Sequence, residues 1–243
     1  MPTVIHTVPF KLLKLTLILF LPLLTAFSGS AQFIYGFKAG ANISNMRIEN
    51  GARNVILGDF RAKPGFNAGF IGEIPVNGWL SIQFQVNYDQ RGVNYFEEKY
   101  ELGNRTSIDG NINLHYLEIP LFVKYHKVLN EKKKRGLHVK LGPDLAYLLA
   151  GKLNGTRSYN EETTGINETV VANTSTSSIG MSIAAGFFFP IKHIRAFVEM
   201  RYNYGFTNDF VGTEEIPSNE LEAYGNVISV NFGMIGFSRW DRY

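Results

Sequence analysis

Apolar and polar residues alternate with a period of two along most of the chain after Gln32. In the clearest case, which runs from Leu80 to Asp89, the two faces are Leu80, Ile82, Phe84, Val86 and Tyr88 on one side and Ser81, Gln83, Gln85, Asn87 and Asp89 on the other. Successive side chains of a β-strand point to opposite faces, so this segment predicts a strand with one apolar and one polar face.

Seven further segments show the same alternation, at 33–44, 65–76, 114–126, 137–149, 179–189, 194–204 and 227–238. Each is close to the length of about 9–11 residues that a tilted strand needs to cross a bilayer. No stretch of helical periodicity is long enough to compete with this pattern. The sequence therefore predicts an all-β chain of eight strands.

The connections between these segments alternate in length. Long connections span 47–63, 93–112, 150–177 and 206–225, and shorter ones span 76–79, 127–136 and 190–193. Outer-membrane barrels have short periplasmic turns, long external loops and an even number of strands. We therefore expect an eight-stranded antiparallel up-and-down transmembrane β-barrel of the small OmpA/OmpX type, with the charged faces inside and the aromatic faces outside.

The N-terminus has the features of a secretory signal peptide. A basic region, a short apolar run and two small residues before the cleavage point follow one another, as Lys11 and Lys14, residues 15–27, and Gly29 and Ala31. The apolar run is shorter than the about 20 residues of a membrane-spanning helix, which disfavours an uncleaved anchor. The sequence predicts a cleaved signal peptide at 1–31 and one barrel domain at 32–243.

Composition narrows the function classes. The chain has 243 residues, 14% of them aromatic, and no cysteine, which excludes disulfides, thiolate metal sites and a lipidated cysteine anchor. Without Lys11 and Lys14, the only charged residues before Gln32, the 24 basic residues become 22 against 21 acidic ones. A net charge of +1 provides no basic footprint for nucleic acid.

Several short segments resemble the PorT-like outer-membrane barrel family of Bacteroidetes. They are Tyr35–Asn42, Tyr116–Leu121 with its Leu-Glu-Ile-Pro-Leu stretch, Val139–Pro143 and Ala185–Phe187. The resemblance runs from about Gln32 to the C-terminus. It implies an eight-stranded barrel in the bacterial outer membrane and, by analogy at the level of the fold, an accessory role in secretion or envelope assembly.

Charged residues on the inward-facing side form the main candidate site. They are Lys38, Glu73, Asp89, Arg91, Glu118, Lys124, Lys140, Asp144, Arg195, Glu199 and Arg201, five acidic and six basic. An eight-stranded barrel has an interior that side chains fill, so these charges must pair. We expect a structural network in the lumen, with Glu118 paired to Arg201 or Lys140. A narrow ion path is the alternative.

Other chemistry has weaker support in the sequence. Four histidines lie in or beside the strands, His115, His126, His138 and His193, and none has the close spacing of a metal site. Ser182 and Ser229 face inward, but no Gly-x-Ser-x-Gly turn surrounds them. We expect no metal, no cofactor and no enzymatic activity. A lipid-modifying enzyme of the outer membrane stays an open alternative.

We therefore expect a structural or interaction role. The partners are outer-membrane lipid and proteins that contact the loops at 93–112 and 150–177, while the run 131–135 is a solvated periplasmic turn. Aromatic side chains on the outer face should form girdles at the membrane interfaces, namely Trp79, Tyr88, Tyr125, Tyr147, Phe187 and Tyr202. A narrow pore and a soluble secreted ligand-binding barrel are the rival functions.

Overall fold

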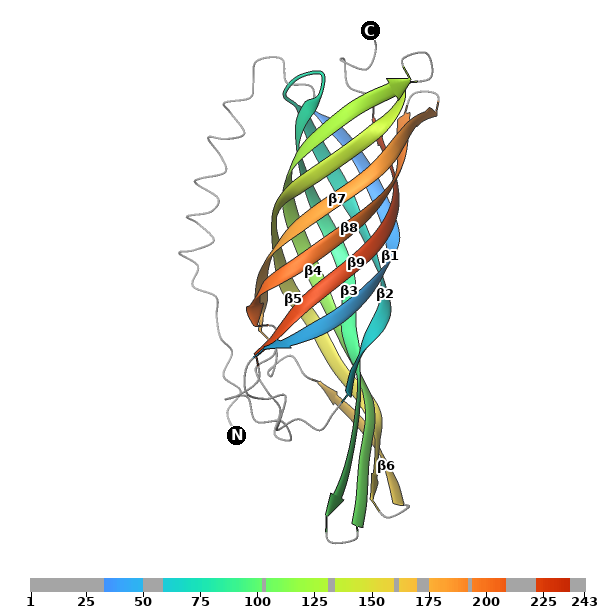
Figure 1. The fold of residues 1–243 in the computed structure, drawn as a ribbon, viewed down its shortest axis with the longest axis vertical. Helices are drawn as coiled ribbons and strands as arrows, with labels where there is room; N and C mark the ends of the chain where they lie inside the picture. Colours follow the sequence, from blue (N-terminus) through green and yellow to red (C-terminus); the bar gives the residue numbers. More distant parts are fainter. Residues whose placement is uncertain are drawn as a thin grey trace.

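The structure, a computed structural model, describes residues 33–49, 59–101, 104–130, 134–159, 162–169, 175–191, 194–208 and 222–236 (Figure 1). The strands are β1 (Ile34–Glu49), β2 (Asp59–Pro75), β3 (Leu80–Glu101), β4 (Asn104–Asn130), β5 (Arg135–Tyr159), β6 (Glu162–Thr169), β7 (Ser177–Ile191), β8 (Ile194–Asn208) and β9 (Glu222–Gly236). Within these residues, no helix is long and apolar enough to span a membrane.

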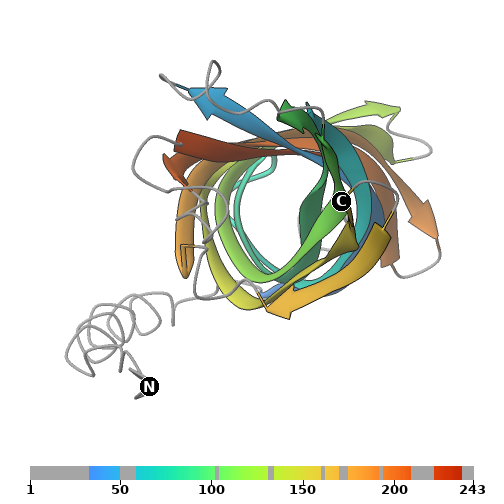
Figure 2. The same ribbon diagram turned by 90° about the horizontal axis from the view of Figure 1, so that it is seen from below.

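Eight of these strands form a closed ring. Each strand pairs antiparallel with the next in the order β1, β2, β3, β4, β5, β7, β8 and β9, and β9 pairs with β1 to close the barrel. The view along the barrel axis shows this ring (Figure 2). The strand β6 pairs only with the outer part of β5 and stands outside the ring. The predicted eight-stranded up-and-down barrel is confirmed.

The barrel is polar inside and apolar outside. In β5, Val139, Leu141 and Leu145 are about half exposed, whereas Lys140 and Asp144 are buried. The same alternation of buried and exposed residues runs along β7. Because lipid solvates the outer face of a membrane barrel, apolar side chains belong there and polar ones belong inside. The predicted assignment of the two faces is therefore correct.

The two ends of the barrel differ in their connections. A tight turn joins β2 to β3, and the Asn77 Oδ1 atom accepts hydrogen bonds from the backbone N–H groups of Trp79 and Leu80 at 2.9 and 2.8 Å. The strand β1 starts and β9 ends at this same end of the barrel. Short turns mark the periplasmic end of outer-membrane barrels, so the opposite end is extracellular.

Two predicted loops are instead strands. The regions 93–112 and 150–177 were expected to be irregular, but β3 continues to Glu101, β4 begins at Asn104 and β5 extends to Tyr159 before β6. These segments are polar on most positions, which hides their strand character in the sequence. Val93, Tyr95 and Ile112 still point apolar side chains into the lumen. Beyond them, cross-strand backbone hydrogen bonds hold the strands in register without a continuous apolar face.

Three sequence predictions concern residues outside the described part of the chain. They are the signal peptide at 1–31, His193, and the first three residues of the basic run at 131–135.

Candidate functional site: the lumen network and the extracellular sheet

The predicted inward charges all lie in the barrel interior. All eleven are 7% exposed or less, and Glu118 is fully buried. We call these residues, with the amides and hydroxyls bonded to them, the lumen network. Burial of an unpaired charge costs on the order of several kcal/mol. The hydrogen-bond and ion-pair partners of each group therefore decide whether the interior is a packed core or an open path.

Glu118 of β4 is the centre of the network. Its Oε2 atom accepts a hydrogen bond from Arg201 Nη1 of β8 at 2.7 Å and one from Asn87 Nδ2 of β3 at 3.0 Å. Its Oε1 atom accepts hydrogen bonds from both Arg201 Nη2 and Arg91 Nη2. One carboxylate thus joins two guanidinium groups from strands on different sides of the ring.

Asp144 of β5 extends this centre. Its Oδ2 atom accepts hydrogen bonds from Arg201 Nη2 at 2.6 Å, Asn203 Nδ2 at 2.6 Å and the Ser182 hydroxyl at 2.7 Å. Arg91 also donates through Nε to Asp89 at 2.7 Å. The two arginines therefore bridge three carboxylates, which gives the alternation of charge that a sealed interior requires.

A second ion pair lies nearer the periplasmic end. The Lys140 ammonium of β5 is 2.8 Å from Glu199 Oε2 of β8, and it donates to Gln83 Oε1 of β3 at 3.0 Å. His138 Nε2 lies 3.1 Å from the same Glu199 carboxylate. Of the two partners expected for Glu118, Arg201 contacts it, whereas Lys140 pairs with Glu199.

Glu73 of β2 holds the third ion pair. Its Oε2 atom accepts from Lys124 Nζ of β4 at 2.6 Å and from Gln83 Nε2 at 3.0 Å, and its Oε1 atom accepts from the Ser81 hydroxyl at 2.9 Å. Glu73 faces Ile34 across the β1–β2 ladder, so this pair lies at the periplasmic mouth.

A ladder of amide side chains on β3 connects the three ion-pair groups. Gln85 Nε2 donates to Gln83 Oε1 at 3.0 Å, and Asn87 Nδ2 donates to Gln85 Oε1 at 3.3 Å. Gln83 contacts Glu73 and Lys140, and Asn87 contacts Glu118. These three amides were assigned to the inward face from their parity but not to the site, because a list of charges overlooks neutral groups that link them.

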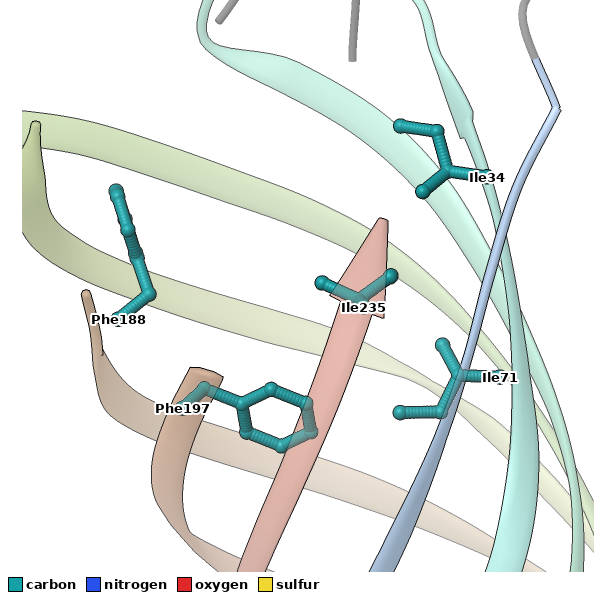
Figure 3. Close-up of a cluster of buried hydrophobic side chains, with 5 residues drawn as sticks. All are labelled: Ile34, Ile71, Phe188, Phe197 and Ile235. Carbon is teal, nitrogen blue, oxygen red and sulfur yellow. The ribbon is translucent and has the colours of Figure 1, made fainter. Parts of the chain in front are cut away.

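Apolar side chains occupy the lumen beside and beyond these charges. At the periplasmic end, five of them pack together, Ile34, Ile71, Phe188, Phe197 and Ile235 (Figure 3). Toward the extracellular end, the buried apolar side chains come from β3, β4 and β5, namely Val93, Tyr95, Ile112, Leu114, Tyr116 and Leu148. The interior is therefore filled with side chains on both sides of the ion pairs.

Two of the predicted inward cations have surroundings that differ from those of the paired ones. The guanidinium of Arg195 lies over the Phe188 ring, 4.7 Å from its centroid. The Lys38 ammonium is buried and has no hydrogen-bond partner among the residues that the structure describes. Within the described contacts, no hydrogen bond therefore offsets the burial of the Lys38 ammonium.

The histidines and serines that the sequence singled out have separate surroundings. His115 faces outward, with Nδ1 2.5 Å from the Tyr88 hydroxyl, while His126 and His138 face the lumen beside Phe188. No three His, Asp or Glu side chains of the described residues are arranged to hold a metal ion. The Ser182 hydroxyl bonds Asp144, and Ser229 accepts a hydrogen bond from Asn231 at 3.2 Å.

Four strands continue past the barrel at its extracellular end. We call residues 97–101, 104–109, 153–159 and 162–169 of β3, β4, β5 and β6 the extracellular sheet; it extends below the barrel in Figure 1. The β3–β4 hairpin stays in register to Glu101 and Asn104, and β5 pairs with β6 from Lys152 to Tyr159. Among the described pairings, β2 accompanies β3 only as far as Phe96, so both outer edges of this sheet are open.

The aromatic side chains expected at the membrane interfaces lie on the outer face. Five of them are each more than a third exposed, namely Trp79, Tyr125, Tyr147, Phe187 and Tyr202. The ring centroids of Trp79 and Tyr125 are 5.9 Å apart. Tyr88 points the same way but is partly covered, because Phe66 and His115 pack against its ring. Together with the polar lumen, this outer surface defines the protein as a transmembrane β-barrel.

Comparison of the sequence with protein families agrees with this class. Residues 27–211 match the family described as "Outer membrane protein beta-barrel domain", which is more than half of the chain. The chain therefore belongs to this family, and the protein resides in the bacterial outer membrane. No protein with a curated description matches the chain.

Solved structures of other barrels are similar to this one at low sequence identity. OprG from Pseudomonas aeruginosa is 12% identical with a TM-score of 0.47, over 86% of this chain and 99% of its own. Neisserial surface protein A is 14% identical with a TM-score of 0.39, over 83% and 96%. Ail, the attachment invasion locus protein of Yersinia pestis, is 14% identical with a TM-score of 0.37, over 84% and 99%.

Proposed function

We propose that this protein is a non-enzymatic outer-membrane barrel that presents the extracellular sheet to a protein partner. The observation that carries the proposal is the continuation of four paired strands beyond the barrel wall. Loops are the usual place for binding residues because they tolerate sequence change. Here the projecting segments are hydrogen-bonded strands on a rigid barrel, so little ordering is needed before a partner binds.

The lumen supports this proposal over a pore. A conducting path requires polar groups that water and ions reach, as in the water-filled interior of porins. In this barrel the central carboxylate, Glu118, is fully buried between Arg91 and Arg201. The periplasmic cluster around Phe188 and Phe197 adds apolar side chains to the same interior. Both features are typical of a packed core.

The surroundings of the inward serines disfavour a hydrolase. A serine nucleophile needs a base within hydrogen-bond reach. The Ser182 hydroxyl is fully buried and donates to Asp144, while Arg201 Nε donates to it at 3.1 Å. A hydroxyl held between a carboxylate and a guanidinium has no imidazole to accept its proton. It serves as a link in the lumen network.

The test uses the full chain in the outer membrane of cells. A photo-crosslinking residue is placed at Thr164 of β6, and a matched one is placed at the lipid-facing Val139 of β5. We expect a protein adduct of one reproducible mass from position 164 and none from position 139. A second variant replaces 155–166 by an Asn-Gly turn between the paired residues Asn154 and Asn167.

On a gel of an unboiled sample, a folded barrel migrates as a compact, faster band that disappears on boiling, and the shortened variant should keep this band. The same variant should lose partner binding, which is measured through a crosslinker at Ser107 on the neighbouring β4. Adducts that form equally from the lipid-facing position, or that persist with equal yield in the shortened variant, contradict the proposal. Loss of the compact band would instead identify a folding defect. In that case the single substitution Thr164→Pro, at the open edge, repeats the test.

We also infer an accessory role in secretion or envelope assembly from the resemblance to the PorT-like family of Bacteroidetes. The resemblance rests on the strand segments around Tyr116–Leu121 and Val139–Pro143, and it supports a role by analogy only. Deletion of the gene should reduce secretion of other proteins, and unchanged secretion would exclude the role. Export through a cleaved signal peptide is tested by N-terminal sequencing of the mature protein, which should begin at Gln32.

A further inference from the structure

A basic patch lies on the outward face of the barrel at its extracellular rim. Two rows of cross-strand neighbours form it: Arg61 pairs with Asn94 and Asn94 with Asn111, while Gly92 pairs with Asn113 and Asn113 with Lys152. Lys63 lies over the second row. We call Arg61, Lys63, Asn94, Asn111, Asn113 and Lys152 the rim patch. It contains three cations, and the exposed Asp109 lies one row further from the membrane on the same face.

The rim patch begins where the apolar outer surface ends. One row of residues closer to the periplasm, His115 faces outward between Gln90 and Ala150. One further row toward the periplasm is aromatic. In it, Tyr88 of β3 pairs with Leu117 of β4, and Leu117 pairs with the exposed Tyr147 of β5. Aromatic residues mark the membrane interface. The row of Asn113 and Lys152 lies four strand residues beyond the aromatic row, which is about 13 Å along strands that tilt in the bilayer. The cations therefore lie on the extracellular side of the aromatic row, where the lipid headgroups begin.

The backbone fixes the position of the Lys63 ammonium. A β-bulge interrupts the β2–β3 ladder between Ala62 and Asn67, and it turns Lys63 sideways across β3. Lys63 Nζ donates to Asn111 Oδ1 at 2.9 Å and to Asn113 Oδ1 at 2.5 Å. The side chain passes over Gly92, where an added Cβ would overlap the Ile112 carbonyl oxygen and lie 3.2 Å from Lys63 Cδ.

This arrangement differs from an ordinary scatter of surface lysines. The Lys63 side chain is ordered before any ligand arrives, so binding loses less side-chain entropy. The lumen charges of the same barrel are nearly balanced, five acidic against six basic, and most of them are paired with one another. In the two rows nearest the membrane, the outward rim therefore has an excess of positive charge that the lumen does not have. It is complementary to an anion at the height of the headgroups.

We propose that the rim patch binds the phosphate groups of the phosphorylated glycolipid in the outer leaflet of the outer membrane. Basic residues beside a lipid-facing surface attract anionic headgroups, and each contributes separately to binding. Arg61 and Lys152 are exposed on either side of the fixed Lys63 ammonium. The three cations together match a headgroup with more than one phosphate better than a single isolated anion. This inference is independent of the protein partner proposed above.

The test compares lipid retention by the full-length protein and its variants. Purified protein in neutral detergent is titrated with bis-phosphorylated lipid A, with the same lipid after removal of both phosphates, and with inorganic phosphate. Native mass spectrometry measures the bound fraction. The main variant is Arg61→Gln with Lys63→Gln and Lys152→Gln. The control is Lys127→Gln with Arg135→Gln, which removes two exposed cations at the periplasmic end.

We expect the triple variant to weaken binding of bis-phosphorylated lipid A at least tenfold and the control variant to change it less than twofold. The dephosphorylated lipid should bind the original protein as weakly as the phosphorylated lipid binds the triple variant. Equal retention of the two lipids, or equal loss in both variants, overturns the proposal. Inorganic phosphate that competes fully at micromolar concentration would assign the patch to a soluble anion instead.

The single substitution Lys152→Gln protects the test against misfolding. Lys152 is exposed and is not part of the hydrogen bonds that hold Lys63. It should weaken lipid A binding at least twofold with an unchanged compact band on unboiled gels. Unchanged binding by this folded variant, together with a triple variant that does not fold, would count against the rim patch.

Discussion

Arg201 of β8 reaches across the barrel interior to Glu118 of β4, where its Nη1 atom donates to Oε2 at 2.7 Å. The two residues are 83 positions apart and their strands are not neighbours in the ring. Both strands carry a second charge of the lumen network: Glu199 lies on β8 and Lys124 lies on β4. The contact therefore ties together two strands of the wall that share no backbone hydrogen bonds.

The substitution Glu118→Gln should destabilise the barrel. It leaves Arg91 and Arg201 buried without their shared carboxylate, and breaking a buried ion pair from one side costs about 3–5 kcal/mol. The measurement is the temperature at which the compact band of an unboiled sample disappears. The matched control is Glu98→Gln, because Glu98 pairs with the exposed Arg105 and exposed pairs contribute about 0–1 kcal/mol. Equal midpoints for the two variants would contradict the network.

The substitution Lys38→Met should stabilise the barrel. The Lys38 ammonium has no partner in the described contacts, and a buried unsatisfied polar group costs about 1–3 kcal/mol, more when it is charged. Its removal also leaves five basic against five acidic lumen residues. The control is Lys140→Met, which should lower stability because it deprives Glu199 of a bond of 2.8 Å. Urea unfolding of protein in neutral vesicles measures both, and a destabilised Lys38→Met variant would show that this ammonium is paired.

The substitution Ser44→Ala tests the β2 bulge. Where β2 departs from β3, the Ser44 hydroxyl donates to the Gly92 carbonyl at 2.7 Å and accepts from the Gly92 N–H at 2.8 Å. Loss of both bonds leaves buried backbone groups unpaired, which costs about 1–3 kcal/mol. The exposed Ser177→Ala serves as the control. Indistinguishable urea midpoints would mean that the bulge is stable without Ser44.

The barrel should not conduct ions. The protein in a planar lipid bilayer should give no steady current above the background, because its lumen charges are buried and most of them are paired, with apolar side chains at both sides of them. A double substitution, Phe188→Ala with Phe197→Ala, removes the periplasmic rings and should leave the current unchanged, since the Glu118 centre still fills the middle of the barrel. Steady currents from the original protein would restore the narrow pore as its function.

The sequence predicted the ring but not its cross-connections. A period of two is a local property, so it located the eight strands and sorted Glu118, Lys140 and Arg201 to the inward face. Which inward charges meet depends on the stagger between strands, which no single segment encodes. For that reason Lys140 was an equal candidate for Glu118, although its partner is Glu199.

Features that depend on pairing rather than polarity were also missed. The polar segment around Ser107 and Ser158 has no apolar face, so it was expected to be a loop, while the structure shows the extracellular sheet there. Lys63 gave no signal beyond its charge, because its direction is set by a bulge and by the missing side chain of Gly92. Conversely, the outward position of His115 agrees with the period of two, because His115 is three residues from the inward-facing Glu118 and so points to the opposite face.

The link between Arg201 and Glu118 has a consequence for the entry of the chain into the membrane. Since β5 and β7 lie between β4 and β8, these two side chains meet only when the sheet has curved around the lumen. A partly formed sheet laid into the bilayer would turn both charges toward hydrocarbon, where an ionised side chain at the midplane is costly. Insertion one hairpin at a time is therefore unfavourable for this chain, and the strands must curl into a cylinder before or as they cross the lipid.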